Sequence, residues 1–336
     1  MHNSSVVASN NTWIGEVYSP LLIDKINVML KREESSVPCI DDYLNKLRLG
    51  NPNNPHSDTF DEQFRQRTAE WMFKVVDFYD LDRDITSTAM NYLDRYLTAS
   101  TLHHRLSKNQ CCLISTACLK LAIKVSLSPI LWEFTFILYS SHFISSQLLE
   151  PRTFHMTDMI KLGMSSSFSF SPKQIISMEN DILFALGFDV LPCTALQFAY
   201  YLVCCLPSEV PSSTRYVLQE LSKYMTELAV CVYKFVAFKP SVKALAVVCC
   251  AIDSLDDGNE ISTESQTVFA LRVHDLFGLW FHDDEEIIGL KEELKNLICH
   301  NTNLEEFVKL IRASHKEEEK ANVSESPKSN AVNIFE

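Results

Sequence analysis

Residues 64–97 contain two consecutive amphipathic helical patterns, joined by a short polar turn. Apolar residues recur there every three or four positions, which is the period of a helix with one buried face. Two charged residues, Arg65 and Asp94, lie among these apolar positions, one in each predicted helix. The segment therefore predicts two packed helices with a charge on each that needs an explanation.

Composition extends this helical prediction to the rest of the chain. The 336 residues suffice for about two domains of typical size, and 46% of them are hydrophobic, enough for a sizeable core. Only seven glycines occur, which disfavours β-sandwiches and Gly-rich phosphate loops. The formal net charge of −13 argues against non-specific binding to nucleic acid or to an anionic membrane, and leaves room for a basic protein partner.

The chain contains eleven cysteines, many of them adjacent and inside apolar helical runs. None forms a C-x-x-C motif or pairs with histidine at zinc spacing, so we expect buried free thiols in a reducing compartment, and no metal. No G-x-S-x-G, phosphate loop or carboxylate pair with a partner histidine occurs, so we expect neither an enzyme nor a cofactor. We also expect no signal peptide, because no basic segment precedes an apolar run near the N-terminus.

Start and stop signals divide the first half into helices. We expect helices at about 21–33, 60–79, 85–98, 108–124, 154–163 and 172–186, with a linker at 50–58. Capping boxes are predicted at Thr59 with Glu62, at Ser107 with Gln110 and at Ser171 with Gln174, and Gly187 ends the last helix. The helix at 108–124 is apolar or small on nearly every side, which predicts a central position.

A second set of helices begins after Pro192. The predicted starts are Thr194 with Gln197, Ser241, and Asp283 with Glu286; the predicted helices include 212–232, 284–299 and 303–313. The chain then turns polar and charged, which is typical of a disordered tail. Each half thus arranges several helices around one that is rich in Ala and Cys.

Particular residues give this pattern a family resemblance. Trp71-Met72, the run Ala89-Met90-Asn91-Tyr92-Leu93-Asp94-Arg95-Tyr96-Leu97, and Phe238-Lys239-Pro240-Ser241-Val242-Lys243-Ala244-Leu245-Ala246 resemble the tandem cyclin boxes of cyclins over about 20–313. The first box is most similar to D-type cyclins. The resemblance implies an all-α fold of two tandem five-helix domains. Its parts would be an N-terminal segment with one helix (1–58), two boxes (59–189 and 190–313) and a disordered acidic, polar tail (314–336).

The resemblance also assigns roles to four charged residues. Arg65 and Asp94 match the family's buried ion pair, which makes physical sense because either charge alone in the core would cost several kcal/mol. Lys124 and Glu179 match the Lys and Glu with which cyclins bind their kinase. The alternatives are two unrelated surface charges for the first pair, and a solvated helix end and a surface carboxylate for the second.

The implied function is that of a regulatory subunit. It would bind and activate a cyclin-dependent Ser/Thr protein kinase as a heterodimer and control cell-cycle progression at G1/S, in nucleus and cytoplasm. No nucleic acid, membrane or small-molecule substrate is expected. The alternative is a transcriptional-type cyclin or another transcription regulator of the same fold, although a general transcription factor of this fold would be basic and carry a zinc ribbon.

The sequence departs from the family at the docking groove that many cyclins carry on the first helix. The corresponding positions are Phe64, Arg67, Thr68, Trp71 and Lys74. Arg and Thr replace two aliphatic residues, and Lys74 stands where the family has an acid. Because like charges at an interface cost affinity, we predict weak or absent binding of Arg-x-Leu peptides. Ser326, followed by Pro327 and Lys328, is a minimal proline-directed phosphorylation site.

The second departure is an apolar insert at about 125–147, directly after Lys124. Deleting it restores the family's spacing to Glu150-Pro151. Four interpretations are open: an unspliced intron, a lineage-specific loop, a membrane-spanning helix of marginal length, or an extra core helix.

Overall fold

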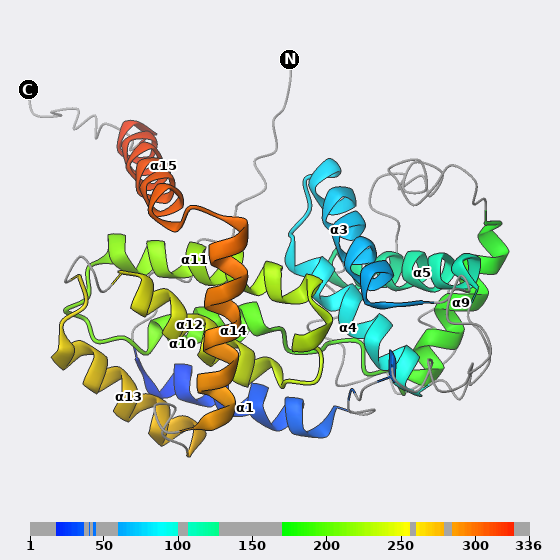
Figure 1. The fold of residues 1–336 in the computed structure, drawn as a ribbon, viewed down its shortest axis with the longest axis horizontal. Helices are drawn as coiled ribbons and strands as arrows, with labels where there is room; N and C mark the ends of the chain where they lie inside the picture. Colours follow the sequence, from blue (N-terminus) through cyan, green and yellow to red (C-terminus); the bar gives the residue numbers. More distant parts are fainter. Residues whose placement is uncertain are drawn as a thin grey trace, which may run out of the picture. The chain divides into compact units, whose positions relative to one another are not determined.

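The computed structural model describes residues 18–36, 40, 43–44, 60–99, 107–127, 170–255, 260–278 and 284–325. Within these ranges all regular structure is helical (Figure 1). The helices are α1 (Pro20–Ser35), α3 (Glu62–Phe78), α4 (Asp84–Ala99), α5 (Lys108–Leu127), α9 (Pro172–Ala185), α10 (Ala195–Cys204), α11 (Ser212–Cys231), the 3-10 turn η2 (Tyr233–Phe235), α12 (Pro240–Leu255), α13 (Thr263–Phe277), α14 (Glu285–Asn301) and α15 (Leu304–Glu325). The predicted all-α class is confirmed.

The chain forms two compact units that do not follow chain order. One, here the α3–α9 unit, comprises residues 24–198 and 226–244. The other, here the α13–α15 unit, groups residues up to 23 with 199–225 and 245 onward.

Helix α5 lies at the centre of the α3–α9 unit and packs against both α4 and α9. Its small residues Ala117, Cys118 and Ala122 are fully buried, as the sequence pattern indicates. Small side chains let neighbouring helix backbones approach closely, and α4 and α9, which pack against α5, supply larger residues to the same core. The core therefore surrounds the helix that ends beside Lys124.

Local capping signals place the ends of the helices on either side of the insert. Ser107 and Gln110 cap each other at the start of α5, with Gln110 N donating to Ser107 Oγ at 3.3 Å. Ser171 and Gln174 form a capping box at the start of α9, and Pro172 occupies its first position. Gly187 follows α9 with a φ of 58°, a left-handed conformation that glycine adopts without strain. These three predictions are confirmed.

Three other predicted starts are wrong, namely those at Thr59, Asp283 and Ser241. The N-cap of α3 is Asp61, whose carboxylate accepts from Phe64 N at 2.7 Å, whereas Thr59 lies outside the described residues. The N-cap of α14 is Asp284, one residue after the predicted Asp283. Aspartate is as good a cap as threonine, so spacing alone did not select the right residue.

The start of α12 is capped from another helix. Ser241 lies inside the first turn, because α12 begins at Pro240. Its backbone N–H and its hydroxyl both donate to the carboxylate of Glu33 in α1, at 2.8 Å and 2.5 Å. Glu33, which is far away in the sequence, thus caps the start of α12 in place of Ser241.

In the α13–α15 unit, helix α15 continues to Glu325 and buries Val308 and Ile311. Residues 314–325, expected in a disordered tail, are therefore helical. Ala, Glu and Lys, which are strong helix formers, dominate this stretch and extend a helix that packing has already nucleated.

Several predictions fall outside the described residues: the linker at 50–58, the helix at 154–163, positions 128–147 of the insert, and Ser326. Residues 125–127 are the last three of α5. Within the described part of the chain, none of the helices is both long and apolar enough to span a membrane.

Candidate functional site

Arg65 of α3 and Asp94 of α4 form a bidentate ion pair in the core of the α3–α9 unit. Arg65 Nη2 lies 2.7 Å from Asp94 Oδ2, and Arg65 Nε donates to Asp94 Oδ1 at 2.9 Å. Both residues are buried, with exposed fractions of 2% and 4%. The pair joins two helices that the sequence placed next to each other, and its burial contradicts the alternative of two surface charges.

Two further groups complete this cluster. The hydroxyl of Tyr43 donates to Asp94 Oδ1 at 2.7 Å, and Arg65 Nη1 donates to the backbone oxygen of Val230, near the end of α11, at 2.9 Å. Sequence reasoning missed both, because neither a tyrosine between predicted helices nor a carbonyl group carries a recognisable pattern. The cluster thus holds α3, α4, the segment at Tyr43 and the end of α11 together.

The electrostatics of the cluster fix its protonation. Burial by itself lowers the pKa of Arg65, but the charge and hydrogen bonds of Asp94 outweigh it and raise that pKa overall. Burial and then the Asp94 charge raise the pKa of Tyr43 well above its usual range. Tyr43 is therefore a neutral donor and Arg65 a permanent cation at physiological pH.

A second set of contacts fixes the segment that follows α9. Arg95 Nη1 donates to the backbone oxygen of Asp189 at 2.9 Å, and Arg95 Nη2 lies 3.0 Å from the Asp189 carboxylate. The hydroxyl of Tyr92 donates to the backbone oxygen of Val190. Because Arg95 and Tyr92 both belong to α4, this helix anchors the chain just beyond the C-terminal end of α9.

Lys124 and Glu179 meet where α5 and α9 pack together. Lys124 Nζ donates to Glu179 Oε2 at 2.9 Å. The Glu179 side chain is only 7% exposed, whereas that of Lys124 is 25% exposed. The alternative of a surface carboxylate is thus wrong for Glu179. A second lysine, Lys120, lies one helical turn before Lys124, with its Nζ 3.6 Å from Glu179 Oε1.

Next to this pair, α9 exposes large apolar side chains. Ile176 is 47% exposed and Phe184 is 69% exposed, and the Phe184 ring lies edge-on to that of Phe188 at 5.3 Å. Positions 176, 180 and 184 are spaced by four and lie on one face of the helix. Exposed apolar groups on a helix that also carries a partly buried charge pair are typical of a protein-binding surface.

The predicted docking groove on α3 is partly core. Thr68 and Trp71 are buried, and the Thr68 hydroxyl donates to the backbone oxygen of Phe64 at 2.9 Å. Phe64 is half-buried, while Arg67 and Lys74 are exposed. The accessible part of this face therefore presents two cations.

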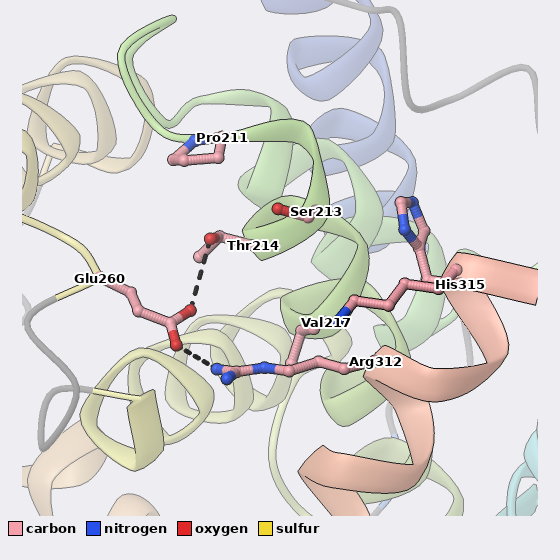
Figure 2. Close-up of a pocket in the computed structure, with 8 residues that line it drawn as sticks. Pro211, Ser213, Thr214, Val217, Glu260, Arg312 and His315 are labelled. Atoms are coloured by element: carbon pink, nitrogen blue, oxygen red, sulfur yellow. Dashed lines mark hydrogen bonds and ion pairs between the residues drawn. The ribbon is translucent and has the colours of Figure 1, made fainter. Parts of the chain in front are cut away.

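A cavity in the α13–α15 unit was not anticipated from the sequence (Figure 2). It has a volume of about 350 Å³ and is lined by the start of α11, by Glu260 and by Arg312, His315 and Lys316 of α15. Glu260 pairs with Arg312 and accepts from the Thr214 hydroxyl at 3.4 Å. Since an internal carboxylate already neutralises Arg312, we assign no function to this cavity.

The described cysteines are free thiols, and most are buried, with Cys299 exposed. No group of three or more potential metal ligands occurs among the described residues. The groups that stand out in this part of the chain are therefore the charge pairs and the exposed face of α9.

Comparison with known families identifies the class of protein. The family model of the cyclin N-terminal domain matches residues 26–191, and that of the cyclin C-terminal domain matches residues 193–329. The chain therefore belongs to the cyclin family, and the predicted resemblance is confirmed.

Individual relatives are distant. G1/S-specific cyclin-D1 of Xenopus laevis is 24% identical over 257 residues, which cover 75% of this chain and 74% of that protein. Cyclin-D3-3 of Arabidopsis thaliana is 24% identical over 259 residues, covering 74% of this chain and 58% of that protein. The X-ray structure of a viral cyclin from Herpesvirus saimiri superposes with a TM-score of 0.51 at 16% identity, covering 81% of this chain and 97% of that one, which shows a shared fold.

Proposed function

We propose that this chain is the regulatory subunit of a cyclin-dependent Ser/Thr protein kinase, which it binds and activates. The observation that carries the proposal is the Lys124–Glu179 pair beside the exposed apolar face of α9. Family membership supports it, because these two residues stand where cyclins carry their kinase-binding Lys and Glu.

The proposed mechanism needs no chemistry from this chain. Helix α9 would pack against the mobile regulatory helix of the kinase through Ile176 and Phe184, while Lys124 and Glu179 hydrogen-bond to the kinase backbone. A kinase is active only when that helix is held inward, so that its catalytic Lys–Glu pair forms. Because the chain binds this arrangement better than the inactive one, it shifts the kinase population toward activity.

The test is co-purification with candidate cyclin-dependent kinases, followed by a kinase assay. We expect Lys124→Ala with Glu179→Ala to reduce activation at least about tenfold, the effect of losing roughly 1.4 kcal/mol of interface energy. The matched control is Glu306→Ala with Lys309→Ala, an exposed pair on α15 with the same change in composition and charge. If the first double variant activates as well as the control does, the proposed site is wrong.

We further propose that the chain acts at G1/S, in the nucleus and cytoplasm. The name of one relative, G1/S-specific cyclin-D1, supports the phase. Protein abundance in synchronised cells tests it, since a G1/S role requires the chain to be present before DNA synthesis begins. A fluorescent fusion tests the location.

Substrate recruitment through α3 is proposed to differ from that of cyclins with an acidic groove. Exposed Arg67 and Lys74 would repel a basic peptide, and buried Thr68 and Trp71 offer it little surface. We expect no binding of an Arg-x-Leu peptide tighter than about 100 μM, since each unfavourable charge contact removes about tenfold in affinity. A titration that gives micromolar affinity would contradict this proposal.

A further inference from the structure

Glu179 is shared between two lysines of one helix. Lys124 donates to Oε2 at 2.9 Å, while Lys120 Nζ lies 3.6 Å from Oε1. Lys120 and Lys124 are four residues apart on α5 and therefore share a face. Within the described part of the chain, Oε1 accepts no hydrogen bond, although it is buried. The carboxylate thus has one hydrogen-bonded cation, Lys124, and a second cation, Lys120, within ion-pair distance.

The second lysine becomes important when Lys124 leaves Glu179 to bind the backbone of a partner. A partner backbone that accepts a hydrogen bond from Lys124 must compete with Glu179 for its ammonium group. If Lys124 were the single counter-ion, its departure would leave Glu179 as a buried charge without a partner, which is strongly unfavourable. Lys120, less exposed than Lys124 at 16% against 25%, is placed to remain and neutralise it.

We propose that Lys120 is a positioning residue of the kinase-binding site. It keeps the Glu179 carboxylate paired and oriented toward the partner while Lys124 exchanges its bond to Glu179 for one to the kinase. The inference rests on the proposed function and adds a residue to it. Lys120 acts through Glu179 and need not touch the kinase itself.

The test is a double-mutant cycle on affinity for the kinase identified by co-purification. We expect Lys120→Met, which keeps the side-chain length, to weaken binding about tenfold, a coupling typical of residues in one charge network. Lys120→Arg should restore affinity to within about twofold, since it returns the cation. In a Glu179→Gln background, Lys120→Met should change affinity less than about twofold, because its target has lost its charge.

The matched control is Lys108→Met, an exposed lysine at the opposite end of α5. It should leave affinity unchanged, and circular dichroism should show that each variant is folded. The positioning role is refuted if Lys120→Met does not weaken kinase binding, or weakens it equally with Glu and with Gln at position 179. In that case, binding of the kinase by the wild-type chain still supports the proposed function. A wild-type chain that binds no kinase refutes the proposed function and this role with it.

Discussion

Removing the charge of Asp94 should destabilise the chain more than most single substitutions do. Asp94 accepts two hydrogen bonds from Arg65 and one from Tyr43, all of 2.9 Å or less. Asp94→Leu would leave the Arg65 cation buried without a counter-ion. Such a loss costs about 3–5 kcal/mol, a large part of the 5–15 kcal/mol that stabilises a typical domain.

A double-mutant cycle that combines Asp94→Leu with Arg65→Met isolates the contribution of the ion pair. The double variant replaces both charges with apolar side chains, which is often nearly neutral at buried sites. We therefore expect the free energy of unfolding of the double variant to be about 3 kcal/mol higher than the two single effects would give if they simply added. The remaining cost of the double variant includes the hydrogen bond from Arg65 to Val230, which every chain carrying Arg65→Met loses.

The assay is urea unfolding followed by far-UV circular dichroism, with the free energy of unfolding extrapolated to water. The control is Asp77→Ala, which breaks an exposed ion pair to Arg83 and should cost less than about 1 kcal/mol. The reasoning is refuted if Asp94→Leu costs no more than Asp77→Ala does, or if the two single effects simply add.

Three further predictions test individual groups. Tyr43→Phe should lower the free energy of unfolding by about 1.5–3 kcal/mol, because it removes a buried hydrogen bond to the charged Asp94; an unchanged urea midpoint would contradict this. Burial raises the pKa of Asp84 from 3.8 to about 6, so the folded state holds this proton more tightly than the unfolded state does. The free energy of unfolding that this group contributes should therefore fall as the pH rises from about 4 to 6. Asp84→Asn should remove that fall, and the difference between the two chains in urea midpoint across this pH range measures it. A thiol reagent should modify exposed Cys299 in the folded chain long before Cys118, whose pKa is raised by burial; equal rates would show that the core opens readily.

What the sequence revealed best was local. The capping box of Ser171 and Gln174 and the helix end at Gly187 depend on neighbours within four residues, so spacing and residue type suffice to predict them. The buried stripe of α4 was readable for the same reason, since a helical period specifies which side chains face inward.

The features that could not be predicted from the sequence depend on contacts between distant segments. The Ser241 groups are satisfied by Glu33, a contact across 208 positions that no local pattern signals. Tyr43 reaches Asp94 across 51 positions, and no pattern local to either residue signals that contact. The capping of α13 by Ser262 and its end at Gly278 did carry local signals, which the sequence analysis overlooked.

The charge pairs of the core and the proposed kinase-binding surface belong to the same compact unit, which we expect to fold as a whole. Helix α4 carries Asp94 of the buried pair, packs against α5, and anchors the segment after α9 through the contact of Arg95 with Asp189. Helices α5 and α9 in turn carry Lys124 and Glu179. A variant of the buried pair should therefore weaken kinase activation by lowering the folded fraction of the chain, and its activation per folded molecule should stay unchanged. Site variants at Lys124 should behave in the opposite way, because they alter the surface and leave the core intact.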